Sequence, residues 1–337
     1  MPQPPNVVSS LKGRSFLAIR DLEAEEIRGL VDSAAYFKRL KEAGEPHRLL
    51  EGKNIVLIFE KTSTRTRASF EVAGSDLGLG VTYLDSRTSQ MGDKESIADT
   101  ARVLGGIYDA IEYRGFGQEI VEELAERSGV PVINGLTDEA HPTQTIADLL
   151  TIAEHAPGGI EGAKVAYFGD ARNNVANSLL VGLVKLGVDV AFAAPEGLQP
   201  APELLDWARA EAKNTGSTLT VTTDPAEAAA GATALYTDIW VSMGEPEELW
   251  AERIERLKPY QVTSELVGSA ADGAIVLHCL PAFHNKDTTI GAAVAERFGL
   301  NELEITDEVF ESAASKVFEQ AANRMHTIKA IIAATLA

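Results

Sequence analysis

Short apolar runs alternate with stretches of helical spacing along the whole chain, and this alternation constrains the fold more than any other feature. Asn54–Phe59 is typical of a buried strand, and Thr66–Leu77 of the helix that follows it. The other predicted strands are Val81–Leu84, Ala110–Tyr113, Pro131–Asn134, Lys164–Phe168, Val188–Ala193, Thr218–Thr222, Ala234–Asp238 and Ala274–Leu280. This order predicts an α/β protein with doubly wound parallel sheets that helices cover on both faces.

The predicted strands fall into two series. The length of 337 residues already favours two domains over one. The run Ala156-Pro157-Gly158-Gly159 interrupts the alternation, so we place the boundary near it and expect domains over residues 1–150 and 151–315. The last segment, Glu311–Leu336, has an apolar stripe at helical spacing and predicts one long helix. Because ligands of open parallel sheets bind beyond the carboxyl ends of the strands, we expect the chemistry just after each strand.

The charge balance and the single cysteine limit the partners and the compartment. With 30 basic and 50 acidic residues the net charge is −20, which disfavours binding to nucleic acid or to an anionic membrane surface. An anionic substrate would therefore have to meet a local cluster of arginines. Cys279 alone permits no intrachain disulfide, and the start of the chain lacks the basic and apolar regions of a signal peptide. We expect a cytoplasmic protein that does not enter membranes.

The strongest functional signal lies between the first predicted strand and its helix, in Ser63-Thr64-Arg65-Thr66-Arg67. The first turn of a helix has unpaired N–H groups and a partial positive charge, so it attracts anions. Three hydroxyl groups add donors, and two guanidinium groups add the planar forks that suit phosphate. A lone Ser-Thr-Arg would more simply be a helix cap with a surface arginine. The interleaved pair favours a phosphate site, although the run is not a Walker A loop.

Polar residues also follow later predicted strands. His141 and Gln144, three residues apart at a helix start, could hydrogen-bond a carbonyl oxygen and an amide. Asp238 and Cys279 could face a cationic amine from two strand ends. A purely structural role is also possible for each of these residues. His141 could cap the helix, and the Cys279 thiol could be a small buried hydrophobic group.

Two cofactor classes are disfavoured. Lys164–Phe168 runs into a segment with one glycine, where the dinucleotide fingerprint needs three, which argues against a nicotinamide cofactor. The spacing of His278, Cys279 and His284 fits no common structural zinc site, so we expect no metal.

Taken together, the motifs resemble the aspartate/ornithine transcarbamylase family. The matching runs, in the family's order, are Ser63-Thr64-Arg65-Thr66-Arg67, Tyr113-Arg114-Gly115, His141-Pro142-Thr143-Gln144, Asp170-Ala171-Arg172-Asn173-Asn174, Asp238 through Gly244, His278-Cys279-Leu280-Pro281 and Arg324-Met325-His326. The Ser-Met-Gly and His-Cys-Leu-Pro runs are typical of the ornithine branch. The resemblance implies transfer of a carbamoyl group from carbamoyl phosphate to the δ-amine of L-ornithine, which gives L-citrulline and phosphate without a cofactor or metal. It leaves open whether the reaction serves arginine synthesis or breakdown.

The resemblance also implies which residues act. Residues 1–150, completed by a last helix over 316–337 that crosses back, would bind carbamoyl phosphate, and residues 151–315 would bind ornithine. The implied carbamoyl phosphate ligands are Ser63, Thr64, Arg65, Thr66, Gln90, Arg114, His141, Gln144, Cys279, Leu280 and Arg324. The implied ornithine ligands are Asn174, Asp238, Ser242 and Met243. The implied catalytic residues are Arg65, Arg114, His141, Cys279 and Asp238. A homotrimer, or an assembly of trimers, is implied as well, with sites at subunit interfaces.

One departure and three alternatives remain at this stage. Asp93 stands where close microbial relatives carry histidine, and its carboxylate could pair with Lys94 and weaken the pull of that lysine on phosphate. A carbamoyltransferase acting on another amine such as putrescine is the nearest alternative. Asn174 and the Ser242-Met243-Gly244 run favour an amino acid, because putrescine has no α-carboxylate. The full set of phosphate and ornithine residues argues against a non-catalytic binding protein. The absent glycine fingerprint argues against a dehydrogenase.

Overall fold

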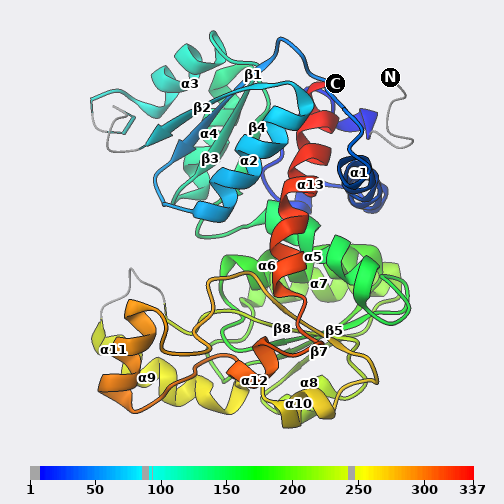
Figure 1. Cartoon of the computed structure of the whole chain (residues 1–337), viewed down its shortest axis with the longest axis vertical. Helices are drawn as coiled ribbons and strands as arrows, with labels where there is room; N and C mark the ends of the chain where they lie inside the picture. Colours follow the sequence, from blue (N-terminus) through cyan, green and yellow to red (C-terminus); the bar gives the residue numbers. More distant parts are fainter. Residues whose placement is uncertain (1–7, 86–90, 93, 242–246) are drawn as a thin grey trace. The chain divides into compact units, whose positions relative to one another are not determined.

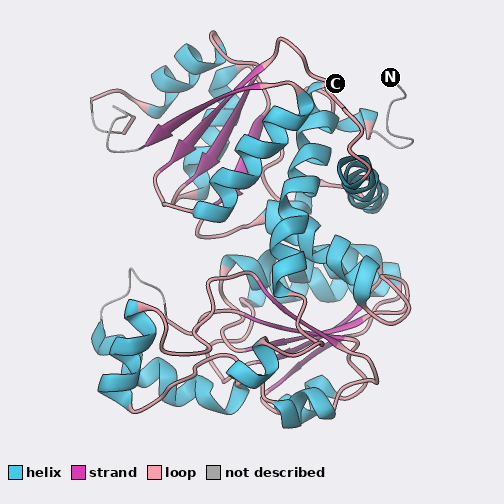
Figure 2. Ribbon diagram, viewed as in Figure 1, coloured by secondary structure: helices cyan, strands magenta, loops and turns pink. Residues whose placement is uncertain are grey.

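The computed structural model describes residues 8–85, 91–92, 94–241 and 247–337. Within these residues, nine strands form two parallel sheets, and each sheet belongs to one compact unit (Figure 1). Unit 1 comprises Met1–Leu150 together with Ala321–Ala337, and unit 2 comprises Thr151–Gln320. Helices flank the sheet of each unit (Figure 2). The prediction of an α/β fold with two parallel sheets is confirmed.

Unit 1 contains a four-stranded sheet in the order β2-β1-β3-β4. Its strands are β1 Asn54–Phe59, β2 Gly80–Asp85, β3 Ala110–Arg114 and β4 Val132–Leu136. Its helices are α1 Ala24–Glu42, α2 Thr64–Leu77, α3 Ile97–Gly105, α4 Gln118–Ser128 and most of α5 Pro142–His155. The chain leaves β1 toward β2 on one side, and β3 pairs with the other side of β1. This reversal between β1 and β3 is the place where open α/β sheets bind ligands.

The start of α2 is set by its N-cap. Ser63 has extended backbone angles, and its side chain accepts a hydrogen bond from the Thr66 N–H at 3.2 Å. The helix therefore begins at Thr64, two residues before the predicted start. As a consequence, the first-turn N–H groups of α2 lie directly beyond the carboxyl end of β1.

Two adjacent glycines at the end of α3 give a stability prediction. A Cβ atom at Gly105 would lie 1.8 Å from the Ser128 carbonyl oxygen at the end of α4, whereas one at Gly106 would meet nothing closer than 3.5 Å. We expect Gly105→Ala to lower the free energy of unfolding by about 1–3 kcal/mol through overpacking. The matched Gly106→Ala variant is expected to leave it nearly unchanged. Urea unfolding of both variants tests this pair, and equal stabilities would contradict it.

Unit 2 contains a five-stranded sheet in the order β7-β6-β5-β8-β9. Its strands are β5 Lys164–Phe168, β6 Asp189–Ala193, β7 Leu219–Thr222, β8 Ala234–Thr237 and β9 Ile275–His278. Its helices include α6 Asn174–Leu186, α7 Pro202–Thr215, α8 Pro225–Ala229, α9 Glu247–Leu257, α10 Ser264–Gly268, α11 Thr289–Phe298 and α12 Asp307–Phe310. Here the strand order reverses between β5 and β8, so the residues after these two strands occupy the binding position of this sheet.

The last helix differs from the prediction of one helix over Glu311–Leu336. The structure has the short α12 and then α13, Val317–Leu336. Between them the chain runs beside β9, because the Val276 N–H donates to the Ala314 carbonyl at 2.8 Å and the Lys316 N–H donates to the Val276 carbonyl at 2.9 Å. These long-range bonds replace the helical ones that the sequence pattern favours.

Most of α13 belongs to unit 1. The buried Lys329 ammonium lies 2.5 Å from the carboxylate of Asp76 at the end of α2. The Lys38 ammonium of α1 donates to Asn323 at 2.9 Å. These contacts hold α13 against two helices of the unit, which fixes the position of Arg324 between them. In the described part of the chain, no helix has both the length and the apolar character needed to cross a membrane.

Candidate functional site

In unit 1, the buried hydroxyl group of Thr66 contacts side chains from two distant segments and from the N-cap residue of its own helix. Thr66 Oγ1 accepts hydrogen bonds from Arg324 Nη2 at 2.8 Å and from Arg114 Nη1 at 3.3 Å. Ser63 Oγ lies 3.1 Å from the same oxygen. Arg114 is the last residue of β3, and Arg324 lies on α13. Two guanidinium groups therefore converge on the first turn of α2, which makes this end of the sheet suitable for an anion.

The other members of the Ser-Thr-Arg-Thr-Arg run differ in their surroundings. Thr64 is exposed as the first residue of α2, and Arg65 is half-buried. Arg67 is exposed, and its guanidinium lies 2.8 Å from the Glu71 carboxylate and 3.8 Å from the centre of the Tyr83 ring. Arg67 is thus a surface arginine paired with an acidic residue, which is the structural alternative to a phosphate ligand. We do not include it among the candidate phosphate ligands.

His141 stands just before α5 and is almost fully buried. Burial is the main cause that holds the pKa of its imidazole well below the usual 6.5, and the positive charges of Arg324, Arg114 and Arg65 lower the pKa further. The three arginines are therefore near this ring. At neutral pH His141 is uncharged, and a neutral imidazole can donate one hydrogen bond to a polarised oxygen.

Gln144 is also buried, and its orientation is set by Asp148 one helical turn later. Gln144 Nε2 donates to Asp148 Oδ1 at 2.8 Å. This contact leaves Gln144 Oε1 as an acceptor that has no hydrogen-bond partner among the described residues. An unsatisfied buried acceptor is suited to an N–H group of a ligand. Asp148 is not among the residues predicted from the motifs, although its i, i+4 spacing from Gln144 is typical of such a pair.

Glu112 on β3 is a second residue that the sequence analysis missed. Its carboxyl is fully buried, and neither oxygen has a hydrogen-bond partner in the described part of the chain. Burial raises the pKa of this carboxyl well above its usual 4.5, and the charges of Arg114 and Arg324 oppose the rise. Gly135 leaves room for it, because a Cβ at that position would lie 1.9 Å from Glu112 Oε1. A glutamate on an apolar strand pattern gives no signal of this kind in the sequence.

The depressed pKa of His141 gives a prediction for stability against pH. Below about pH 6.5 the unfolded chain takes up a proton at His141 that the folded protein does not bind. Stability from this group is therefore fully present above pH 6.5, and it falls by up to about 1.4 kcal/mol per pH unit as the pH drops toward the lowered folded pKa. His141→Asn removes this dependence. Urea unfolding from pH 7 to pH 5 should show a shallower loss for the variant, and parallel curves would contradict the buried neutral ring.

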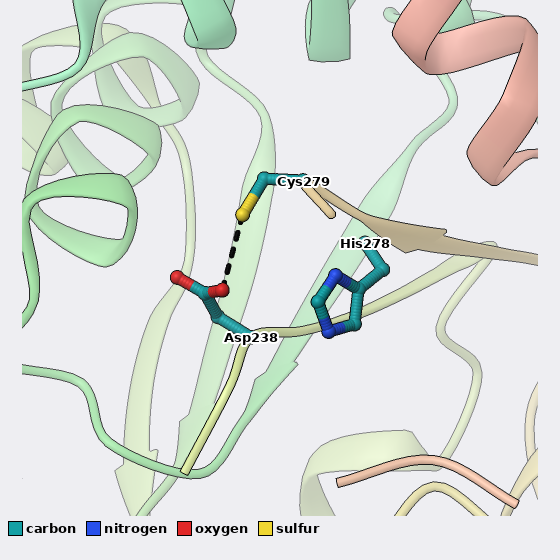
Figure 3. A group of neighbouring side chains, drawn as sticks. All are labelled: Asp238, His278 and Cys279. Atoms are coloured by element: carbon teal, nitrogen blue, oxygen red, sulfur yellow. Dashed lines mark hydrogen bonds between the residues drawn. The ribbon is translucent and has the colours of Figure 1, made fainter. Parts of the chain in front are cut away.

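In unit 2, Asp238 and Cys279 follow neighbouring strands. Thr237, the last residue of β8, is paired with His278, the last residue of β9. The residues that follow them, Asp238 and Cys279, therefore lie side by side. Cys279 Sγ donates to Asp238 Oδ1 at 3.0 Å, and the Ile239 N–H donates to the same oxygen at 2.8 Å. Figure 3 shows the sulfur and the carboxylate facing one another, with the His278 imidazole beside them. The predicted proximity of the carboxylate and the thiol is thus present.

Burial has a clear electrostatic effect on Asp238. It raises the pKa of the Asp238 carboxyl above its usual 3.8, while the hydrogen bonds from Cys279 and from the Ile239 N–H oppose the rise. A buried carboxylate of this kind is stabilised by any cation that reaches it. The arrangement can therefore hold a ligand amine more strongly than an exposed aspartate could.

The remaining predicted ligands are distributed as follows. Asn174 is the first residue of α6 and is partly exposed beyond β5, next to the N-cap residue Asn173. Leu280 is partly buried and follows Cys279 directly. Gln90, Ser242, Met243 and the Asp93 departure lie outside the described residues.

Two groups of potential metal ligands occur among the described residues. The ligand atoms of Asp238, His278 and Cys279 lie within 4.8 Å of one another, and those of His284, Asp307 and Glu311 form a second group. His284 therefore does not join His278 and Cys279 in the zinc site considered from the sequence. Both ring nitrogens of His278 already have partners, Glu304 and the Leu280 N–H. A metal ion would have to displace one of these contacts.

Comparison with known proteins finds two family models that together match most of the chain. Residues 14–154 match a family model described as the carbamoyl-P binding domain of aspartate/ornithine carbamoyltransferase, and residues 161–335 match its Asp/Orn binding domain. The chain belongs to the aspartate/ornithine carbamoyltransferase family. The resemblance inferred from the motifs is therefore confirmed.

Individual members of the carbamoyltransferase family are similar over nearly the whole chain. A protein of Treponema denticola named "Ornithine carbamoyltransferase, catabolic" is 59% identical over 327 residues, which are 97% of this chain and 96% of the relative. A protein of the same name from Bacillus cereus is 56% identical over 328 residues, which are 97% of each chain. The solved structure of ornithine carbamoyltransferase from Pyrococcus furiosus is 42% identical, with a TM-score of 0.87 and coverage of 97% of this chain and 98% of that chain.

Proposed function

We propose that this carbamoyltransferase transfers the carbamoyl group of carbamoyl phosphate to the δ-amine of L-ornithine, with L-citrulline and phosphate as products. The observation that carries the choice of an amine acceptor is the contact between Cys279 and the buried Asp238 carboxylate. The names and the 59% and 56% identities of the relatives from T. denticola and B. cereus support the choice of ornithine.

The unit 1 cluster supports a specific arrangement of carbamoyl phosphate. The phosphate would lie at the first turn of α2, where Ser63, Thr64, Arg65 and Thr66 supply N–H, hydroxyl and guanidinium donors. Arg114 and the neutral His141 would donate to the carbonyl oxygen. Gln144 Oε1, which Asp148 leaves as an acceptor, would receive the carbamoyl N–H. Arg324, Cys279 and Leu280 complete the proposed ligand set, together with Gln90.

The proposed chemistry needs no covalent enzyme intermediate. The lone pair of the neutral δ-amine forms a bond to the carbonyl carbon, and the carbonyl electrons move to the oxygen. Arg114 and His141 would stabilise that oxyanion, because preset donors are most effective where charge develops. The electrons of the oxyanion then re-form the carbonyl bond as the carbon–oxygen bond to phosphate breaks and its electrons leave with the phosphate. The attacking nitrogen loses one proton, which the departing phosphate can accept. Holding both substrates together supplies a further part of the rate.

Unit 2 would orient ornithine. Asp238 and Cys279 would contact its amino groups, and Asn174, Ser242 and Met243 would hold the α-amino and α-carboxylate groups. The relatives at 59% and 56% identity are both named catabolic, whereas a Campylobacter jejuni structure titled anabolic is 36% identical. We therefore favour arginine breakdown over arginine synthesis as the role of the reaction. A homotrimer, or an assembly of trimers, in the cytoplasm is part of the same proposal.

One assay tests the proposed acceptor. The purified protein is supplied with carbamoyl phosphate and equal concentrations of L-ornithine, putrescine or L-aspartate, and the carbamoylated products are measured. L-citrulline should form fastest. Faster formation of carbamoylputrescine or carbamoylaspartate would overturn the assignment of ornithine, and no product with any amine would overturn the enzymatic role.

A further inference from the structure

His278 lies at the end of β9, and its backbone N–H and both of its ring nitrogens have hydrogen-bond partners. Its ring is fully buried, with Nε2 3.2 Å from Glu304 Oε1. Its Nδ1 accepts the Leu280 N–H at 2.9 Å, and its own backbone N–H donates to Gln320 Oε1 at 2.9 Å. The residue that precedes Cys279 is thus held by contacts to Leu280 in its own segment and to two distant residues, Glu304 and Gln320.

The hydrogen bonds assign the tautomer of this ring. Because Nδ1 accepts the Leu280 N–H, it carries no proton in this contact, so the proton of the ring is on Nε2. Nε2 then donates to Glu304, whose carboxylate is an acceptor. A carboxylate that orients a histidine in this way fixes which nitrogen is free to accept, as in the outer shell of many metal and catalytic sites.

The segment that His278 holds has an unfavourable backbone. Leu280 has φ of 58°, and it is the only residue other than glycine with positive φ in the described part of the chain. A side-chain-bearing residue in the left-handed region costs free energy and persists only where its surroundings force it. The bond from the Leu280 N–H to His278 Nδ1 is one such constraint.

Glu304 holds the other end of the same segment. Its Oε1 also accepts the Phe283 N–H at 2.6 Å, so one oxygen atom contacts both His278 and the residue after the turn. The backbone of Glu304 is itself fixed, because its carbonyl accepts the Val262 N–H at 2.9 Å and Ile305 forms a bridge with Val262. Both ends of the 279–283 segment are therefore held by Glu304, which lies outside the His278-Cys279-Leu280-Pro281 motif.

We propose that Glu304 is a positioning residue for the Cys279–Leu280 segment: by holding His278 and Phe283, it sets the backbone that directs the Cys279 thiol to Asp238. This inference rests on the proposed function, in which Cys279 and Leu280 contact the substrates. Glu304 would not touch either substrate, and its effect on the reaction would pass through His278.

The test compares substitutions that separate acceptor geometry from charge. Glu304→Gln keeps the reach and an acceptor oxygen, Glu304→Asp keeps the charge but shortens the side chain, and Glu304→Ala removes both contacts. Glu302→Ala is the matched control, because Glu302 also accepts a backbone N–H, that of Asp307 at 2.9 Å. Cys279 is the only cysteine of the chain, so its rate of reaction with a disulfide reagent reports this segment without any need for activity.

The proposal predicts a clear order of effects. Glu304→Ala should lower kcat/KM for ornithine by about 10²-fold, the size expected when a reacting group is misplaced by about 1 Å. It should also speed the reaction of the Cys279 thiol. Glu304→Gln should stay close to the wild type in both measurements, Glu304→Asp should be intermediate, and Glu302→Ala should match the wild type.

Two results would overturn the proposal. One is a folded Glu304→Ala protein with wild-type kinetics and thiol reactivity. If the alanine variant does not fold, the other two variants decide, and a Glu304→Asp protein that outperforms Glu304→Gln would show that charge matters more than geometry. Cys279→Ala separates this outcome from a failure of the proposed function: unchanged ornithine kinetics in that variant would remove Cys279 from the site, whatever Glu304 does to the thiol.

Discussion

Arg324→Ala is expected to weaken the binding of carbamoyl phosphate by about 10- to 150-fold, since a hydrogen bond to a charged group contributes about 1.5–3 kcal/mol. Arg324 is almost fully buried, and its Nη2 donates to Thr66 Oγ1 at 2.8 Å. Alanine would remove a guanidinium donor from the proposed phosphate position and would leave a cavity beside α2. Because Arg324 also lowers the pKa of His141, that pKa should rise toward its usual value in the variant.

Calorimetric titration with carbamoyl phosphate measures the loss of affinity directly. Arg67→Ala is the matched control, because Arg67 lies on the same helix as Thr66 but is paired with Glu71 and Tyr83. That control should retain wild-type affinity. If Arg324→Ala bound carbamoyl phosphate as tightly as Arg67→Ala does, α13 would have no place in the proposed phosphate site.

Asp238→Asn should lower kcat/KM for ornithine by a similar factor, about 10- to 150-fold. The variant keeps the size of the side chain and removes the negative charge that the buried carboxylate offers to a cationic amine. The affinity of the free enzyme for carbamoyl phosphate should change little, because most of the proposed ligands of that substrate belong to unit 1.

Steady-state kinetics with ornithine and putrescine give the sharpest measurement for Asp238→Asn. Ornithine and putrescine both carry two amino groups and differ in the α-carboxylate of ornithine. If Asp238 contacts an amino group, the variant should therefore lose kcat/KM for both amines and keep most of its preference for ornithine. Equal losses for ornithine and for carbamoyl phosphate would point to a folding defect, and the proposed assignment of Asp238 to ornithine would lose its support.

Local sequence patterns predicted most of the strands and the position of the anion-binding turn. Asn54–Phe59 and Lys164–Phe168 form β1 and β5 with the predicted bounds, and each of the other strands differs from prediction by one or two residues at one or both ends. The Ser-Thr-Arg-Thr-Arg run does follow a strand and opens a helix, since the cap that starts α2 comes from Ser63 within the motif itself.

Long-range contacts decided the features that the sequence analysis did not predict. The late start of α13 depends on Val276, about forty residues earlier in the chain, and local helical spacing contains no information about that pairing. Arg65 and Arg67 stand two residues apart in one motif, so the sequence does not distinguish them. In the fold, the Arg67 guanidinium lies over the ring of Tyr83 on β2. Nothing near Glu304 in the sequence indicates that it holds His278.

The sequence by itself determined which residue types stand at the carboxyl ends of the strands, because strand periodicity, helix caps and short motifs depend on neighbours within a few residues. Only the tertiary structure decided how those residues are held. The convergence of Arg114 and Arg324 on Thr66, and of Glu304 on His278, depends on strand order and helix packing. Burial then shifts the pKa values, since desolvation lowers the pKa of His141 and raises that of Asp238 in environments that exist only after folding.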